Sequence, residues 1–362
     1  MVIRRVMLNV LKVLLLAVCS FHSVFAFSGE YTVATYYFPG WRSNQVGAPA
    51  AFPWSRIKSY PEREPLLGWY DDGDMDIVSQ QMSWMHSYGI DYVIFDWYWT
   101  GRNTPLLTQS IDAYKKVHSP KPGFAVMWSN HNETPISAEN FDSMVRFWVD
   151  NYFHDPKYWK IDRKPVVYVF SVQDLVKKAS KIGTTSGRLL ERANAIARKS
   201  GYDGLYFVGG VGLERQIVRE GVDDYGYDAF SAYNYHIGLE LGSSKLKALS
   251  ASYAELDRGY QFVWDWMVKF AKRPYFIPVT SGWNKAPWGG SSDSEHDKSE
   301  SNVDSFRSHL NSARAYLDNY PAATNKTIVI CCWNEYGEGS YIEPTKKMGF
   351  QYLDVVKQVF RK

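Results

Sequence analysis

The sequence predicts an α/β protein built as a single (β/α)8 TIM barrel, and two observations carry this prediction. Eight short runs of β-branched and aromatic residues alternate along the chain with segments whose apolar residues recur at helical spacing. Most of the strand-like runs are almost continuously apolar, as expected of parallel strands that are buried on both faces. Because parallel neighbours require crossover connections, eight such strand-helix units predict a closed barrel.

The predicted strands begin soon after the N-terminal region and end near the C-terminus. In chain order they are Val33–Phe38, Tyr92–Asp96, Gly123–Trp128, Pro165–Phe170, Gly204–Val208, Ala229–Tyr233, Tyr275–Thr280 and Thr327–Trp333. A doubly wound open sheet is the alternative, but such a sheet usually carries a glycine-rich phosphate loop after its first strand. Here the first strand runs into Phe38-Pro39-Gly40-Trp41, which is no such loop.

Predicted helices are marked by apolar residues three and four positions apart. The longest such stripe predicts a helix over Leu246–Phe270. Shorter patterns contain Val78, Met82 and Met85; Leu189, Ala193 and Ile196; Phe306, Leu310, Ala313 and Leu317; and Gln351–Phe360. Two long stretches, Arg42–Asp74 and Asn284–Asn302, show neither the strand nor the helix spacing of apolar residues. Loops of that length are uncommon unless they are functional. The second is rich in Gly, Ser and Asp, and we expect it to be mobile.

The first 26 residues have the three parts of a secretory signal peptide. Two arginines precede an apolar run from Val13 to Val18, and Val24-Phe25-Ala26 fits the cleavage pattern. An uncleaved anchor is the alternative, but no uncharged run reaches the about 20 apolar residues that a spanning helix needs. We therefore expect a signal peptide at 1–26, one domain at 27–362, and a secreted or periplasmic mature protein without stable membrane insertion.

Composition narrows the class of partner. The formal net charge is only +3 and no stripe of Lys and Arg is present, which argues against nucleic acid as a partner. The 14 Trp and 26 Tyr suit either a wide core or a cleft that stacks flat, hydroxylated ligands. Beyond the leader the cysteines are Cys331 and Cys332. Neighbours on a strand point to opposite faces, so we expect no structural disulfide and two small core residues.

Polar and aromatic residues gather where the predicted strands end, and in barrels of this type the active site lies at those carboxyl ends. Any one of these residues alone is more often structural. Together they predict an aromatic cleft suited to an oligosaccharide. The expected sugar contacts are Tyr37, Trp97, Trp128, Asn130, His131, Tyr233, Trp283 and Asn334.

Glu335 and Glu338, which follow the eighth strand, are the candidate catalytic residues. Hydrolysis of a glycosidic bond needs an acid for the leaving oxygen and a second carboxylate as nucleophile or base. Gly337 and Gly339 permit a turn that brings both carboxylates into one cleft. Two close carboxylates push their pKa values apart, which supplies one acid and one base. Two solvated surface glutamates are the alternative, but the end of the eighth strand is where barrel chemistry lies.

Other candidate chemistries find less support, and we expect neither a catalytic metal nor another cofactor. His131, His236 and Asp96 lack metal-ligand spacing, and no His-Glu-x-x-His or Cys-x-x-Cys motif is present. A Gly-x-Ser-x-Gly elbow, which a serine hydrolase of the α/β type would carry, is also absent. The acidic run at 71–74 is interpreted as the N-terminal cap of the helix that follows.

Five segments resemble glycoside hydrolase family 99 and its WbsX-like relatives. They are Val33–Trp41 (ending YYFPGW), Gly89–Trp99 (GIDYVIFDWYW), Trp128–His131 (WSNH), Gly282–Pro287 (GWNKAP) and Trp333–Pro344 (WNEYGEGSYIEP). The most specific element is the last, an Asn-Glu-x-x-Glu-Gly block followed by Ile-Glu-Pro. The resemblance covers nearly the whole of 27–362. It implies a (β/α)8 catalytic domain that cleaves α-mannosidic bonds within a chain, with retention and without a metal.

The resemblance also implies roles for the two glutamates. Glu338 corresponds to the general acid. Glu335 matches a carboxylate proposed to deprotonate the 2-hydroxyl of the substrate, which then attacks C1 to form a 1,2-anhydro sugar. An α-mannoside holds its 2-oxygen trans to the leaving group, as an α-rhamnoside also does. One departure is that Tyr336-Gly337 stands where family 99 mannosidases typically have an aromatic residue followed by His, so the substrate need not be a mannan.

Two other function classes stay open on the sequence. The WbsX-like branch has been labelled glycosyltransferase, which would make the protein an enzyme of surface polysaccharide synthesis. A carbohydrate-binding protein that has lost turnover is the non-enzymatic alternative. The carboxylate pair favours the hydrolase. In each case we expect a monomer whose partner is an oligosaccharide or polysaccharide, with no nucleic acid involved.

Overall fold

The computed structural model describes residues 30–42, 53–131, 133–212 and 225–361, so the predicted signal peptide lies outside the described residues. Its main sheet has eight parallel strands in the order β11-β14-β1-β2-β4-β6-β7-β8. These are β1 (Thr32–Tyr37), β2 (Tyr92–Trp99), β4 (Gly123–Trp128), β6 (Lys164–Val169), β7 (Tyr206–Gly210), β8 (Ala229–Ser231), β11 (Ile277–Thr280) and β14 (Thr327–Cys331). All eight predicted strands are confirmed, with small shifts at their ends.

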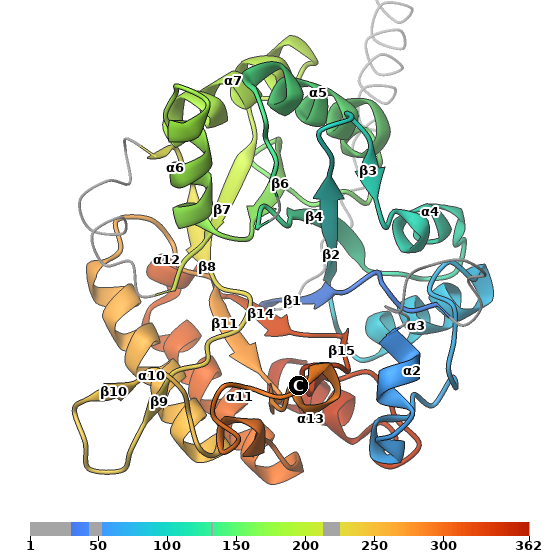
Figure 1. The fold of residues 1–362 in the computed structure, drawn as a ribbon, viewed down its shortest axis with the longest axis vertical. Helices are drawn as coiled ribbons and strands as arrows, with labels where there is room; N and C mark the ends of the chain where they lie inside the picture. Colours follow the sequence, from blue (N-terminus) through green and yellow to red (C-terminus); the bar gives the residue numbers. More distant parts are fainter. Residues whose placement is uncertain (1–29, 43–52, 132, 213–224, 362) are drawn as a thin grey trace, which may run out of the picture.

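The two edges of this sheet meet, which closes it into a barrel (Figure 1). A parallel bridge joins Phe230 of β8 to Tyr275, just before β11. The Phe230 N–H donates to the Pro274 carbonyl at 2.8 Å, and the Phe276 N–H donates to the Phe230 carbonyl at 2.8 Å. An open doubly wound sheet would leave these edges unpaired, so the (β/α)8 prediction is confirmed.

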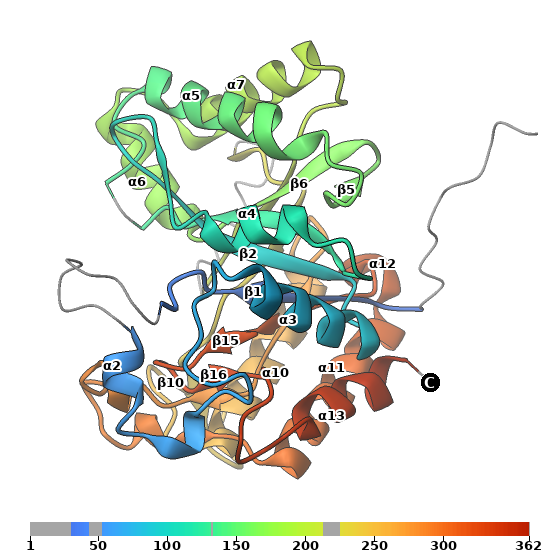
Figure 2. The same ribbon diagram turned by 90° about the vertical axis from the view of Figure 1, so that its right-hand side faces the viewer.

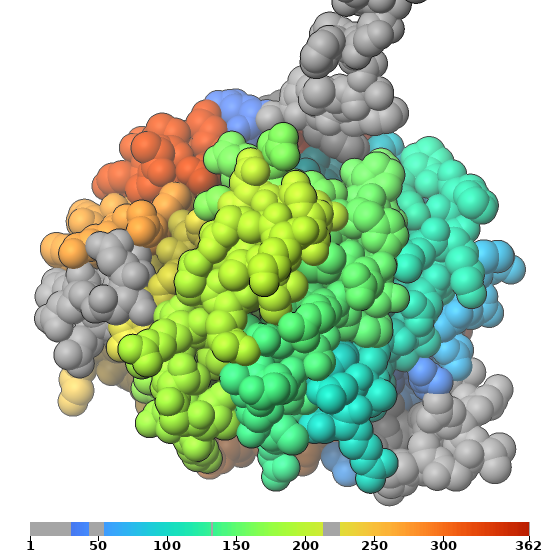
Figure 3. Space-filling model, turned by 90° about the horizontal axis from the view of Figure 1, so that it is seen from above, coloured from blue at the N-terminus to red at the C-terminus, as the bar shows by residue number. Residues whose placement is uncertain are grey.

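Helices surround the strands, and Figure 2 shows them as layers above and below the sheet. They are α2 (Pro53–Ile57), α3 (Met75–Ser87), α4 (Gln109–Lys116), α5 (Ala138–Trp148), α6 (Val172–Lys181), α7 (Ser186–Lys199), α10 (Tyr253–Phe270), α11 (Val303–Asn319), α12 (Pro321–Thr324) and α13 (Gln351–Phe360). The predicted patterns in α3, α7, α11 and α13 are therefore confirmed. Figure 3 shows the face that α5, α6 and α7 cover. Within the described part of the chain, no helix has both the length and the apolar character needed to span a bilayer.

Short strands and single helical turns lie in the connections between the main strands and helices. Besides the eight barrel strands there are β3 (Pro105–Leu106), β5 (Lys160–Ile161), β9 (Gly238–Leu239), β10 (Leu246–Lys247), β12 (Gly282–Trp283), β13 (Ser299–Glu300), β15 (Asn334–Glu335) and β16 (Ser340–Tyr341). Single turns are η1 (Pro61–Arg63), η2 (Val149–Phe153), η3 (Ala286–Trp288) and η4 (His296–Lys298). Of the two stretches predicted as irregular loops, 284–302 contains η3, η4 and β13, and the described part of 42–74 contains α2 and η1.

The helix predicted over Leu246–Phe270 begins later than its apolar stripe suggests. Leu246–Lys247 instead pairs antiparallel with Gly238–Leu239. The helix α10 starts at Tyr253 because the Ser252 side chain caps it, accepting from the Glu255 N–H at 3.3 Å. The apolar spacing continues across this boundary, so periodicity alone placed the start too early.

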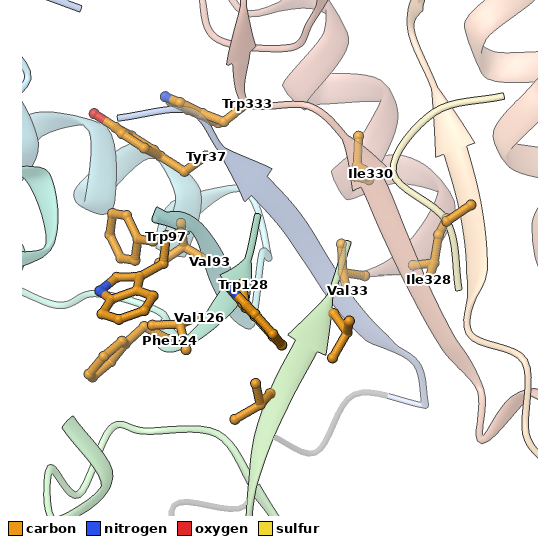
Figure 4. Packing of buried hydrophobic residues seen from close by; sticks show 14 of the residues in the cluster. Val33, Tyr37, Val93, Trp97, Phe124, Val126, Trp128, Ile328, Ile330 and Trp333 are labelled. Carbon is orange, nitrogen blue, oxygen red and sulfur yellow. The ribbon is translucent and has the colours of Figure 1, made fainter. Parts of the chain in front are cut away.

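Strand side chains alternate between two cores, because successive residues of a strand point to opposite faces. The interior of the barrel is filled by residues such as Ala34, Tyr36, Met127, Tyr168 and Val329. Their neighbours pack outward under the helices, and Figure 4 shows Val33, Tyr37, Val93, Trp97, Phe124, Val126 and Trp128 among them. A third cluster joins α2 to the end of the eighth strand and contains Trp41, Trp54, Ile57, Tyr70 and Tyr336.

Cys331 and Cys332 form a disulfide, so the prediction that they would not is wrong. The prediction assumed a strand that continues through both residues, with side chains on opposite faces. The strand β14 ends at Cys331, and the peptide bond between the two residues is cis. Both side chains are fully buried, as predicted.

The acidic run before α3 is only partly a helix cap. Asp74 is the cap, and its side chain accepts from the Asp76 N–H at 2.8 Å. Asp72 is fully buried and accepts from the Trp41 N–H at 2.9 Å and from the Gln109 side chain at 2.9 Å. The capping interpretation is therefore wrong for Asp72, which ties the segment after β1 to α4.

Candidate active site

A cavity of about 380 Å³ opens where the strands end, a volume within the about 300–1,000 Å³ typical of small-molecule sites. Three carboxyl side chains line it, from Asp96, Glu335 and Glu338. Its remaining lining is Phe38, Tyr98, Met127, Ser129, His131, Phe170, Tyr233, Asn234, His236, Trp283 and Trp288. Barrel enzymes carry their chemistry at this end, so we take the cavity as the candidate active site.

A tight hairpin positions the two glutamates. β15, which contains Glu335, pairs antiparallel with β16, and the Glu338 N–H donates to the Glu335 carbonyl at 3.2 Å inside the turn. Gly339 has φ +72°, a conformation that favours glycine, as the predicted turn requires. Gly337 serves a different purpose, because a Cβ there would lie 1.9 Å from Cε2 of Trp288. The turn thus brings both carboxyl groups into one cavity, as predicted.

Glu335 and Asp96 are linked through one tyrosine. The Tyr233 hydroxyl lies 2.8 Å from Oε1 of Glu335 and 3.0 Å from Oδ2 of Asp96. Burial raises the pKa of Glu335 well above its usual range, and the charges of Glu338 and Asp96 raise it further. Burial likewise raises the pKa of Asp96 well above its usual range, with the hydrogen bond from Tyr233 acting in the opposite direction.

Glu338 has a pKa that suits an acid near neutral pH. Burial raises its pKa to about 7, and the positive charge of Lys285 opposes that shift. A carboxyl group with a pKa near the working pH is protonated often enough to donate and can also accept. Burial is therefore the largest cause of the raised pKa of both glutamates, and the charge of Glu338 adds to it for Glu335.

Among the predicted sugar contacts, His131, Tyr233 and Trp283 line the cavity, whereas Tyr37, Trp97 and Trp128 do not. The latter three are buried on the helix side of the strands (Figure 4). Tyr37 donates to Oε1 of Gln81 at 2.9 Å, and Trp97 Nε1 donates to the Tyr152 hydroxyl at 3.1 Å. Their prediction as sugar contacts is wrong because strand alternation turns them outward, into the core under the helices.

Asn130 and Asn334 also lie outside the cavity lining, and each fastens one strand end to the next. Asn334 accepts from the Phe38 N–H at 2.8 Å and donates to the Phe38 carbonyl at 3.0 Å. Asn130 makes the same pair of bonds with Ser171, accepting from its N–H and donating to its carbonyl, each at 2.9 Å. Both are fully buried, so they position backbone and their prediction as sugar contacts is not supported.

The sequence interpretation missed several residues of the cavity. Asp96 was considered only as a metal ligand, and Tyr98 was not singled out. A usable signal existed: Tyr98 lies two positions after Asp96, so strand period places the two on one face, opposite Trp97. The other missed lining residues are Phe38, Met127, Ser129, Phe170, Asn234, His236 and Trp288. Among the described side chains, no group of three or more His, Cys, Asp or Glu is arranged to hold a metal ion.

The segment 284–302 supplies Trp288 and is held by hydrogen bonds within itself and by Arg63 of η1. Asp297 accepts from the N–H groups of Lys285 and Ser291 at 2.8 Å each, and from the Ser291 hydroxyl at 2.7 Å. The buried Arg63 guanidinium donates to Oε1 of Glu300 at 3.1 Å. These bonds give no support to the mobility that composition predicted.

Trp283 is held by a pair of histidines. The ring of His236 meets it edge-on at 4.0 Å between centroids, and His236 Nδ1 lies 3.1 Å from Nε2 of His296. Burial lowers the pKa of His236 to about 4, so this ring is neutral across the physiological range. The pair therefore fixes the indole without adding charge to the cavity.

Glu343 supports the β15–β16 hairpin, which carries the two candidate glutamates, from behind. Its Oε2 accepts from the hydroxyls of Tyr70 and Tyr336 at 2.7 Å and 2.9 Å, and its Oε1 accepts from Gln81 at 2.8 Å. Burial raises its pKa to about 7. Tyr336 follows Glu335 directly, so this network fixes the hairpin that carries the two glutamates.

Comparison with known proteins places the chain in a carbohydrate context. The family model described as "Glycosyltransferase WbsX" matches residues 48–356. The protein WxcX of Xanthomonas campestris pv. campestris (strain B100) is 22% identical over 313 residues, which cover 81% of this chain and 42% of that protein. The chain thus spans less than half the length of this curated relative.

Solved structures share the barrel. A glycoside hydrolase-like protein has a TM-score of 0.66 at 18% identity, covering 95% of this chain and 98% of the other. The GH99 endo-α-mannosidase from Bacteroides thetaiotaomicron has a TM-score of 0.57 at 15% identity, covering 91% and 96%. A family 1 β-glucosidase from Thermotoga maritima has a TM-score of 0.54 at 10% identity, covering 92% and 98%. At these identities the similarity shows the fold alone.

Proposed function

The chain belongs to the WbsX family, and from that premise we propose that it is a glycoside hydrolase acting on an oligosaccharide or polysaccharide. The observation that carries the proposal is the placement of Glu335 and Glu338 in one aromatic-walled cavity at the carboxyl end of a (β/α)8 barrel. Two carboxyl groups are the machinery that hydrolysis of an acetal requires. The N-terminal sequence supports action outside the cytoplasm, in the periplasm or after secretion.

The proposed reaction has two steps. In the first, Glu338 gives its proton to the leaving oxygen as the C1–O bond breaks, while the sugar's 2-oxygen attacks C1 and passes its own proton to Glu335. In the second, water attacks C1 of the 1,2-anhydro sugar, Glu338 takes the proton of that water, and Glu335 returns a proton to the 2-oxygen. Each step inverts C1, so the configuration is retained. The pKa of Glu338 near 7 suits both of its duties.

The substrate class follows from the stereochemistry of the first step. The 2-oxygen and the leaving group must be trans and both axial for backside attack at C1, which α-mannosides and α-rhamnosides satisfy in their stable chairs. Trp283, Trp288 and Tyr98 give the cavity flat apolar surfaces that suit sugar rings. The fold shared with an endo-α-mannosidase supports cleavage within a chain.

A glycan panel tests this proposal. Release of reducing ends is measured for wild type, Glu335→Gln and Glu338→Gln, with Glu191→Gln, an exposed change on α7, as the matched control. We expect hydrolysis of an α-mannoside or α-rhamnoside, a loss of about 10²–10⁴-fold in each active-site variant, and an unchanged control. NMR of the first-formed product should show the α-anomer. A panel in which all α-mannosides and α-rhamnosides stay intact, or a β-product, contradicts the mechanism.

The description of the matching family favours a second candidate, a glycosyltransferase of surface polysaccharide synthesis. This alternative requires a binding site for a nucleotide-linked or lipid-linked sugar. Calorimetric titration of both donor classes into the full chain distinguishes the two. Donor binding followed by transfer to a glycan would favour the transferase, whereas hydrolysis without donor binding removes it.

A further inference from the structure

The contacts of Tyr233 imply that a carboxyl group beside it carries a proton. A phenol hydroxyl has one proton to donate and can accept further hydrogen bonds through its oxygen. The Tyr233 hydroxyl has two carboxyl oxygens within hydrogen-bond distance, 2.8 Å to Glu335 and 3.0 Å to Asp96. With both groups ionised, one of these contacts would join two oxygens with no proton between them. One of the two carboxyl groups therefore donates to Tyr233.

Asp96 is the better candidate for the protonated group. Its Oδ1 is buried and has no hydrogen-bond partner, and neither oxygen of Glu335 or Glu338 shares that condition. An unpartnered oxygen costs less free energy on a neutral acid than on a carboxylate, because an uncompensated buried charge is the larger penalty. The shorter contact of Tyr233 is to Glu335, as expected for donation to an ionised acceptor.

The surroundings of Asp96 agree with this choice. It is 4% exposed and lies on the inner face of β2. The titratable groups that interact with it are Tyr36 from β1, Tyr98 from β2 itself, Tyr233 beyond β8, and Glu335 and Glu338 of the hairpin. All five are neutral or acidic, so burial raises the pKa of Asp96 without a cation opposing it.

We propose that Asp96 is a positioning residue that holds a proton, donates it in a hydrogen bond to the Tyr233 oxygen, and through Tyr233 keeps Glu335 ionised and aimed at the substrate. The inference rests on the proposed function, because only an ionised Glu335 can take the proton of a 2-hydroxyl. Asp96 itself neither gains nor loses a proton during the reaction. A protonated Asp96 carries no charge, so it removes one of the two repulsions that raise the pKa of Glu335, while the hydrogen bond from Tyr233 favours the ionised form of Glu335.

Infrared spectroscopy tests the protonation without any substrate. Spectra of the full chain, with the aspartate carboxyls ¹³C-labelled, are taken well above pH 7, where Glu338, Glu343 and Asp72 with pKa values of about 7 are largely ionised. We expect an isotope-shifted band of a protonated carboxyl that disappears in Asp96→Asn and persists in Asp72→Asn. A wild-type spectrum without that band, or a band that survives Asp96→Asn, overturns the proposal.

Kinetics test the positioning role. Asn offers an N–H where the protonated acid offers an O–H, so Asp96→Asn should keep kcat within about threefold of wild type. Asp96→Ala and Tyr233→Phe should lower kcat at least about tenfold and move the acidic limb of its pH profile, with little change in KM. If Asp96→Asn is as damaging as Asp96→Ala, Asp96 is ionised and the proposal fails. If no glycan is hydrolysed, the proposed function fails while the infrared band still decides the state of Asp96.

Discussion

At the scale of single residues, Glu338 predicts the pH dependence of the proposed reaction. Because its pKa is about 7 and the first step needs its proton, kcat/KM should fall about tenfold per pH unit above 7. Lys285 lowers that pKa, so Lys285→Met should move this alkaline limb to higher pH. The pH profiles of the two proteins on the best glycan measure both effects. A rate that stays level well above pH 7 would contradict the acid role of Glu338.

Gly337 predicts an effect on substrate affinity. An added Cβ would lie 1.9 to 2.3 Å from three atoms of the Trp288 indole, so Gly337→Ala has to displace that ring from the cavity wall. We expect KM to rise about tenfold with a smaller change in kcat.

The matched test is a double-mutant cycle with Trp288→Ala. If displacement of the indole is the whole cause, Gly337→Ala adds nothing in the Trp288→Ala background. Additive effects would instead show that the alanine distorts the hairpin itself. The same contact gives a physical reason for the departure noted from the sequence, since the side chain of a histidine at 337 and the indole of Trp288 cannot share this space.

The residues of the site were only partly predictable for a reason visible in β2. The run Asp96-Trp97-Tyr98-Trp99 contains four residues suited to a sugar cleft, and composition does not say which face looks inward. The structure turns Asp96 and Tyr98 into the cavity and buries Trp97 and Trp99 under the helices. The tryptophans were the obvious candidates for sugar contacts, and that choice was wrong. Large aromatic side chains also fill the core between the barrel strands and the helices, so their size does not distinguish core from cleft.

At the scale of elements, the start of α10 predicts a stability effect. The Ser252 hydroxyl satisfies the Glu255 N–H at the first turn, so Ser252→Ala should lower the free energy of unfolding by about 1 kcal/mol. Urea denaturation measures it, with Ser180→Ala as the control because Ser180 is exposed in the last turn of α6. Equal effects of the two substitutions would show that the cap contributes nothing specific.

Strands and helices were predictable from the sequence where the spacing of apolar residues is unbroken. The continuous apolar runs located all eight barrel strands, since a short run of β-branched and aromatic residues such as Val166 to Val169 is typical of a strand buried on both faces. Boundaries set by individual side chains escaped the pattern. Ser252 starts α10 in the middle of an apolar stripe that shows no break in the sequence. Asp72 accepts a hydrogen bond from the Trp41 backbone instead of capping the helix beside it.

At the scale of the whole molecule, Glu343 predicts a pH-dependent stability. Its folded pKa is about 7 and its ordinary value 4.5, so between these values the folded protein holds a proton that the unfolded chain has lost. Stability from this group is full below about pH 4.5 and is lost as the pH rises toward 7, by about 3 kcal/mol in all.

Glu343→Gln removes that ionisation, so it is the variant to compare. The unfolding free energy of wild type should decline from pH 4.5 to 7 more steeply than that of the variant, as measured by urea denaturation across the range. Asp72, whose burial also raises its pKa to about 7 and whose charge raises the pKa of Glu343, remains in both proteins. Parallel pH curves would show that Glu343 is ionised in the folded protein.

The closed barrel as a whole was predictable from the count of strand-helix units, and the disulfide between Cys331 and Cys332 was not. Counting works because eight parallel strands with crossover helices have few other stable arrangements. The disulfide depends on where one strand stops and on one peptide bond, which no periodic pattern records.

The attachment of Trp288 has a consequence for how such a protein can diversify. The acids stand on β2 and on the hairpin that follows β14, next to the core of the barrel, whereas Trp288 belongs to a separate segment, 284–302, which Arg63 holds through Glu300. Exchange of that segment beyond Lys285 would change the shape offered to a sugar and leave the proton-handling groups in place. New specificities are therefore open to descendants of this chain by a change confined to one surface segment.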